Sequence, residues 1–268
     1  MMHRDRPPDP DILVAIDALT VAVISVTICL WSDRLGRQSV LVPLAILARM
    51  AALGIFAKGV VWRVEIPFFI LCTLLGAFND WNSVVHHRIY RYTVPYDSAF
   101  STIPTWMLLF WGMILRFFAR LARWKNLGPP ARPADRIGIG DWFVESPALK
   151  VGAQLLLILA TRQWIYRTYL DPLFSWLPFL ASLAIYLLFF FPSRHDLKLL
   201  AVFFVGGPAM EMLYIRVGHL HQYYLGWIGG VPLWIVLWWM LAILIWKDLS
   251  LRVENALRAW LVDGKRAS

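Results

Sequence analysis

Two acidic residues, Asp80 and Glu211, lie inside long apolar stretches, where they could donate a proton to a bound molecule. An uncompensated charge in hydrocarbon costs several kcal/mol, so a carboxyl group there needs polar partners or stays protonated. Glu211 precedes Gly218 by seven residues, which places it ~10 Å inside the end of its apolar segment. A protonated carboxyl group kept from water can act as a general acid at neutral pH. The sequence therefore predicts Glu211 and Asp80 as catalytic acids.

A structural role for the same acids is the alternative. Glu211 could pair with Arg216, and Asp80 could accept hydrogen bonds from Asn79 or Asn82, so that each acid only holds helices together. Ionisable residues within membrane segments mark functional sites by default, which favours the catalytic interpretation.

The two acids occupy equivalent positions in an internal repeat. Residues 76–92 align with 207–223 at an offset of 131, and the offset becomes 128 in the segments that follow. Each half contains a glycine, an acid, a tyrosine, a proline and two tryptophans in the same order. The aligned pairs are Gly76 with Gly207, Asp80 with Glu211, Tyr92 with Tyr223, Pro104 with Pro232, Trp106 with Trp234, and Trp111 with Trp239. We interpret this pattern as a duplication.

Aromatic rings near the acids could stabilise a cation formed by protonation. Most aromatic residues of the chain are expected to be packing or membrane-interface residues, but those that recur in the repeat are better candidates. The predicted substrate-binding residues are Tyr92, Tyr223, Trp106, Trp234, Arg216 and Asn79.

Four histidines near the same segment ends offer a second chemistry. They are His86, His87, His219 and His221. Imidazoles together with carboxylates suit iron, copper or zinc. Adjacent histidines cannot point along one helix face, however, and hydrogen bonding at the membrane interface is their usual role. We therefore expect no cofactor and keep the metal site as an alternative.

The composition indicates an integral membrane protein. Of 268 residues, 59% are hydrophobic and 16% are charged, and the mean hydropathy is +0.60. The net charge of +9 lies mostly in loops and tails, so we read it as an orientation signal and predict no nucleic-acid partner. Asp17 and Arg49 are a candidate structural pair. Cys29 and Cys72 are predicted to be packing residues.

Eight apolar segments approach the ~20 residues needed to cross a bilayer. They cover roughly 11–31, 39–61, 65–86, 102–122, 148–166, 173–192, 197–218 and 230–247. The fold class is therefore predicted as all-α, with two four-helix repeats in parallel orientation, related by an axis along the membrane normal. The first helix is expected to be retained rather than cleaved as a signal peptide.

The predicted organisation follows from these segments. It comprises a first repeat at 1–125, a linker at 126–147, a second repeat at 148–247 and an amphipathic tail at 248–268. An even number of spans puts both termini on one side of the membrane, and the positive charge of linker and tail makes that side cytoplasmic. We expect the protein in the inner or plasma membrane.

The pattern Glu-x6-Gly-x4-Tyr, followed by Gly-Gly-Val-Pro-Leu-Trp and Trp-Trp, resembles the membrane carotenoid enzymes. These are the carotenoid hydratases and the heterodimeric-type lycopene cyclases. The resemblance covers about 205–240 directly and 76–112 through the repeat. It implies a membrane enzyme that protonates a double bond of an isoprenoid and then adds water or closes a ring, with no redox cofactor.

The chain also departs from that family pattern. The cyclases have a pair of glutamates after the proline, where this chain has "IPTW" and "VPLW", and this argues against cyclisation. The hydratases carry Gly-x-Tyr-x-Tyr, which is "GHLHQYY" here. A transporter or an accessory subunit of a membrane complex is the non-enzymatic alternative, because Gly206-Gly207-Pro208 could break a helix just before Glu211. The substrate and the oligomeric state stay open.

Overall fold

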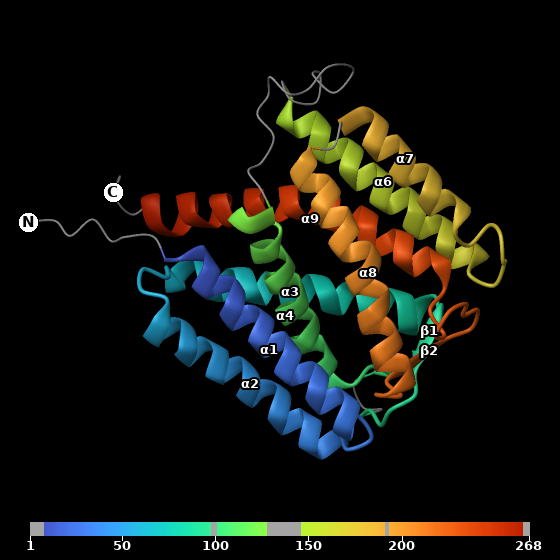
Figure 1. The fold of residues 1–268 in the computed structure, drawn as a ribbon, viewed down its shortest axis with the longest axis horizontal. Helices are drawn as coiled ribbons and strands as arrows, with labels where there is room; N and C mark the ends of the chain where they lie inside the picture. The colour runs from blue at the N-terminus through green and yellow to red at the C-terminus, as the bar shows by residue number, and fades with distance from the viewer. Residues whose placement is uncertain (1–7, 98–100, 128–145, 191–192, 265–268) are drawn as a thin grey trace, which may run out of the picture.

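The computed structural model describes residues 8–97, 101–127, 146–190 and 193–264 (Figure 1). It is mostly helical. The long helices are α1 (Pro10–Trp31), α2 (Leu35–Phe56), α3 (Trp62–Trp81), α4 (Thr105–Leu121), α6 (Pro147–Thr168), α7 (Leu177–Phe190), α8 (Arg194–Arg216) and α9 (Leu233–Arg258). The shorter elements are η1 (Asn82–His86), η2 (Lys125–Leu127), η4 (Ala259–Asp263), and strands β1 (Tyr90–Tyr92) and β2 (His221–Tyr223).

Five helical segments within these ranges are long and apolar enough to cross a membrane. They are Pro10–Trp31, Leu35–Phe56, Trp62–His86, Arg194–Arg216 and Leu233–Val262. Their outer surface is apolar as well, since Leu19 of α1 and Val205 of α8 are each 67% exposed. The coarser prediction, an all-α protein with helices suited to a bilayer, is confirmed. Because α7 has only 14 residues, the total of eight spans stays a prediction.

Helix α8 begins at a capping box and continues through a proline. The Ser193 side chain accepts a hydrogen bond from the backbone of Asp196, whose carboxylate accepts one from the backbone N–H of Ser193 at 2.9 Å. The helix then runs unbroken to Arg216, across residues 206–208. The helix break that would have favoured a transporter is therefore not found at Pro208.

The last long helix extends further than the sequence predicts. A span over 230–247 with a separate tail was expected, but α9 continues unbroken for about three more turns. Two acidic residues beyond the predicted end have basic partners in other parts of the chain. Asp248 lies 2.6 Å from Lys150, and Glu254 lies 2.7 Å from Arg123. The helix therefore continues past residue 247, because paired charges need not end a helix, and the division into a second repeat and a tail at this point stays a prediction.

A buried network of ion pairs joins α1 to α4. Arg49 contacts Asp17 at 2.6 Å, which is the pair expected from the sequence, and also contacts Glu65 at 2.5 Å. Arg116 and Arg120 of α4 contact the second oxygen of Glu65 at 2.6 and 3.0 Å. All five side chains are at least nine-tenths buried, so the charges stabilise each other away from water.

Two helix pairs, α3 with α4 and α8 with α9, pack closely at a glycine. In each pair the glycine on one helix lets a tryptophan of the other helix approach its backbone. A Cβ on Gly76 of α3 would lie 2.5 Å from the Cβ of Trp111 in α4. A Cβ on Gly207 of α8 would lie 3.0 Å from the ring of Trp239 in α9. The rings of Trp111 and Trp239 stack on each other, with centroids 6.2 Å apart, and so connect α4 with α9.

The two ends of the helix bundle differ. The start of α1, the end of α4 and the last turns of α9 lie at one end, and β1 and β2 lie at the other (Figure 1). Most of the linker predicted at 126–147 lies outside the described residues. The chemistry-bearing residues singled out in the sequence gather at the β1 and β2 end.

Candidate active site

The loops that follow α3 and α8 meet in a small antiparallel sheet. Tyr90 pairs with Tyr223, Arg91 with Gln222, and Tyr92 with His221. Arg91 and Gln222 are related by the offset of 131, so the pairing is centred on equivalent positions of the predicted repeat.

The turns that lead into these strands also correspond. Arg88 and His219 are the described non-glycine residues with positive φ, at 53° and 45°. In the first loop the backbone N–H of the next residue bonds to Ser83 O at 2.9 Å, and in the second loop the corresponding N–H bonds to Tyr214 O at 2.9 Å. Every member of these pairs is again separated by 131 residues. The two loops therefore present their strands in the same local geometry.

Asp80 is enclosed by two tyrosine hydroxyls. It is completely buried. Tyr90 donates a hydrogen bond to Oδ1, and Tyr92 donates one to Oδ2 at 2.6 Å. Burial raises the pKa of both tyrosines well above the usual value of 10, so both hydroxyls carry their protons. The structure thus gives Asp80 two dedicated donors from β1.

Glu211 has the corresponding partners from β2. Nε2 of His221 lies 2.9 Å from Oε2 of Glu211, and Tyr223 donates a longer hydrogen bond to the same oxygen at 3.5 Å. Glu211 is 7% exposed, whereas Asp80 has no exposed surface. A carboxyl group paired with an imidazole can share and relay one proton.

Aromatic contacts join the two acid centres. The ring of His221 lies 5.7 Å from Tyr90, 6.3 Å from Tyr92 and 5.3 Å from Tyr223, between centroids. Tyr90 and Tyr223 are 5.3 Å apart. The two acids therefore belong to one buried polar cluster where β1 pairs with β2.

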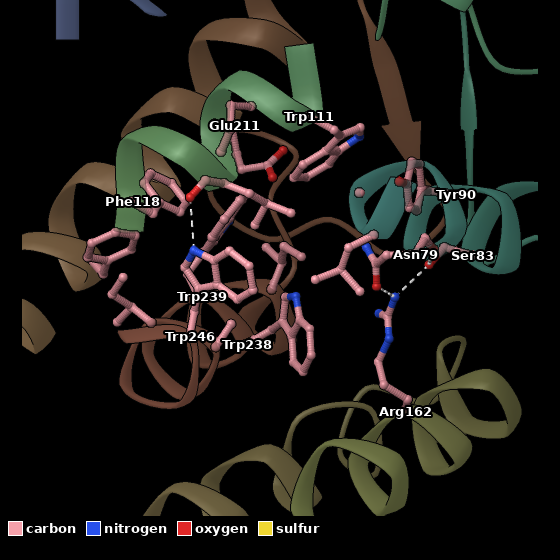
Figure 2. A pocket seen from close by; sticks show the side chains of 18 of the residues that line it. Asn79, Ser83, Tyr90, Trp111, Phe118, Arg162, Glu211, Trp238, Trp239 and Trp246 are labelled. Atoms are coloured by element: carbon pink, nitrogen blue, oxygen red, sulfur yellow. Dashed lines mark hydrogen bonds between the residues drawn. The ribbon is translucent and has the colours of Figure 1, made fainter. Parts of the chain in front are cut away.

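A cavity of about 280 Å³ extends from this cluster between the helices (Figure 2). Its polar wall includes Glu211, His221 and Tyr223, and Asp80 does not reach it because Tyr90 and Tyr92 lie between. Asn79, Ser83 and Arg162 add further polar groups to the wall. Most of the remainder is apolar and rich in tryptophan: Trp111, Trp234, Trp238, Trp239 and Trp246 line it. A neighbouring cavity of about 260 Å³ also touches Glu211. The candidate site therefore consists of one acid, Glu211, in the wall of a mainly apolar cavity.

The structure distributes the predicted substrate-binding residues unequally. Tyr92, Tyr223, Trp234 and Asn79 line the cavity. Trp106 is buried in the core without lining the cavity. Arg216 is exposed and donates a hydrogen bond from Nε to the backbone oxygen of Gly229 at 3.1 Å, so it is neither a partner of Glu211 nor part of the cavity.

The four histidines do not form one site. His86 stacks on Trp81, and His87 stacks on Tyr166 with centroids 3.6 Å apart. Burial lowers the pKa of His87, as do the nearby His86 and Arg162. His219 is exposed at the turn before β2. Across the described ranges, no group of three or more His, Cys, Asp or Glu side chains could hold a metal ion.

Two contacts of functional interest were not predicted from the sequence. The first is the pairing of His221 with Glu211. The sequence could have indicated it, because Tyr90 and His221 are also separated by 131 residues and are therefore equivalent positions of the repeat. The second is Arg162 of α6, whose Nη2 donates to Asn79 Oδ1 and, at 2.8 Å, to Ser83 Oγ. No spacing in the sequence relates α6 to α3, so this contact required the structure.

Comparison of the chain with protein-family models, with curated proteins and with solved structures found no match.

Proposed function

We propose that the protein is a membrane enzyme that protonates a carbon–carbon double bond of an apolar isoprenoid, with Glu211 as the general acid. The observation that carries this proposal is the position of Glu211: it stands on the wall of an apolar, tryptophan-lined cavity and is paired with His221. The resemblance of residues 205–240 to the carotenoid hydratases supports the same chemistry.

In the proposed reaction the O–H bond of Glu211 breaks and its proton forms a new C–H bond with the electron pair of the alkene. The resulting tertiary cation lies against the faces of Trp234 and Trp239, which stabilise positive charge. Water then forms a C–O bond with the cation and returns a proton to Glu211 through His221. The net change is addition of water, and no oxidant or reductant is consumed. Capture by a second alkene would instead give a ring.

We assign Asp80 a supporting role in this reaction. Because Tyr90 and Tyr92 separate it from the cavity, it acts through their hydroxyls, which also approach His221. Asp80 thereby positions the rings that surround the proton donor.

We also propose that the chain crosses the membrane eight times as two parallel repeats, with both termini in the cytoplasm. The matched loop geometry, the glycine–tryptophan contacts in both halves and the common end of α1, α4 and α9 support this arrangement. A reporter fused after Ser268 should then behave as cytoplasmic, and one inserted near Asp97 as external. The opposite result would overturn the topology.

The test of the function is expression of the chain in cells that make carotenoids and other isoprenoids, followed by pigment and lipid analysis. We expect a hydroxylated or cyclised product that disappears with Glu211→Gln, which keeps the size of the side chain and removes the transferable proton. Asp33→Asn is the control, because Asp33 is an exposed acid that does not line the cavity. An unchanged isoprenoid pool in wild-type cells, or a product that survives Glu211→Gln, would contradict the proposal.

A further inference from the structure

Arg162 is a buried arginine that has no carboxylate partner among the described residues. It is 7% exposed, and its hydrogen-bond partners are the neutral Asn79 and Ser83. Within the described part of the chain, no ion pair includes it. The buried Arg49 and Arg116, in contrast, each contact a carboxylate. A buried charge is normally paired, because leaving it unpaired is costly.

The position of Arg162 suggests where its partner binds. Arg162, Asn79 and Ser83 line the same cavity as Glu211. Figure 2 shows the arginine reaching from its helix toward Asn79 and Ser83, beside Trp238. The centre of the guanidinium lies 4.8 Å from the centroid of the Trp238 ring.

The guanidinium group of Arg162 also has N–H donors that make no hydrogen bond with described residues. Only Nη2 makes a hydrogen bond with a described residue. Nε and Nη1 make no hydrogen bond with a described residue, and the side chain to which they belong lines the cavity. Arginine presents its N–H groups as a planar fork that fits the paired oxygens of a carboxylate or a phosphate.

We propose that Arg162, with Asn79 and Ser83, binds an anionic end group, a carboxylate or phosphate, of an amphiphilic isoprenoid. The apolar tail of that ligand occupies the tryptophan-lined part of the cavity and passes Glu211. This inference rests on the proposed function for the identity of the tail and adds the chemistry of the head group. It narrows the apolar isoprenoid of the proposed function to one whose chain ends in a carboxylate or a phosphate.

The test is a binding measurement on the full chain in nanodiscs of neutral phosphatidylcholine. The probes are geranylgeranyl monophosphate, geranylgeranoic acid and the uncharged geranylgeraniol, which share one tail. Because hydrogen bonds to a charged group are among the strong ones, we expect the acid or the phosphate to bind about 10- to 100-fold more tightly than the alcohol. Equal affinity of all three probes for the wild type would overturn the proposal.

Three variants locate the effect. Arg162→Gln should abolish the preference for the anion, whereas Arg167→Gln should keep it, because Arg167 is an exposed arginine of the same helix. Asn79→Asp keeps Arg162 in place but supplies an internal carboxylate, so it should also abolish the preference. A preference that survives both Arg162→Gln and Asn79→Asp would contradict the assignment, and thermal unfolding of each variant shows that it is folded.

Competition distinguishes the source of the anion. Displacement of the isoprenoid phosphate by phosphatidylglycerol or by inorganic phosphate alone, at similar concentration, would mean a bilayer-lipid or free-phosphate site and would overturn the proposal. The readout is binding and does not depend on turnover. If Glu211→Gln changes no product while the anion preference holds, the proposed reaction fails and the head-group site stands.

Discussion

Glu65 holds the buried ion network of α1 to α4 together, and its substitution has a calculable effect. Oε1 accepts from Arg49 at 2.5 Å, and Oε2 accepts from Arg116 at 2.6 Å and from Arg120 at 3.0 Å. Glu65→Gln keeps the volume but leaves these three guanidinium groups with one negative charge fewer, and it turns an N–H₂ group toward other donors. Breaking a buried ion pair from one side costs about 3–5 kcal/mol. At about 2–4 °C per kcal/mol, the unfolding midpoint should fall by roughly 6–20 °C.

The assay is thermal unfolding of the detergent-solubilised protein, followed with a thiol-reactive fluorophore. Cys72 is fully buried in the folded protein and becomes reactive on unfolding. Asp33→Asn is the matched control, because it removes an acid from an ion pair whose side chains are 67% and 70% exposed. A shift for Glu65→Gln no larger than that of the control would refute the view that this network stabilises the first four helices.

Two further predictions concern helix packing and the tyrosines of the acid cluster. Gly207→Ala should destabilise the protein by about 1–3 kcal/mol, because the added Cβ forces Trp239 to move. The adjacent Gly206→Ala has no atom within 4 Å of the added Cβ, so it should be neutral or stabilising by up to about 1 kcal/mol. Equal effects of the two variants in the unfolding assay would contradict the close approach of α8 and α9. Burial raises the pKa of Tyr90, Tyr92 and Tyr223 above 10, so the unfolded chain releases these protons first. The contribution of these tyrosines to stability should therefore be constant below about pH 9 and fall above about pH 10. Tyr90→Phe should reduce that alkaline slope of the unfolding midpoint, and an unchanged slope would show that the hydroxyl is not held protonated by the fold.

The positions of most helices were predictable because a membrane-crossing helix needs an apolar run of fixed length. The acid, glycine and tryptophan of each half were likewise visible as residues at constant offsets, and Asp17 with Arg49 was identified as a pair. Helix ends were less predictable. Asp248 and Glu254 would normally end a span, but Lys150 and Arg123 pair with them in the folded protein.

The composition of the site was only partly accessible from the sequence. The spacing of residues in the sequence does not indicate contacts between elements that the repeat does not relate. The main example is the contact of Arg162 with Asn79 and Ser83. Arg216 was considered as a partner of Glu211 and as a substrate-binding residue, yet five residues along the helix bring it to a different face and to the Gly229 oxygen. Trp106 was selected from the repeat, and its side chain fills the core instead of the cavity wall.

The central claim is that Glu211 delivers a proton to carbon, and solvent deuterium tests it most directly. The purified protein in nanodiscs is incubated in D₂O with isoprenoids of both kinds, hydrocarbons and acids or phosphates, and the recovered molecules are analysed by mass spectrometry and NMR. The account predicts one non-exchangeable deuterium at a former alkene carbon, introduced by the wild type and by Asp33→Asn and absent with Glu211→Gln. No carbon-bound deuterium with the wild type, or undiminished incorporation with Glu211→Gln, would contradict it.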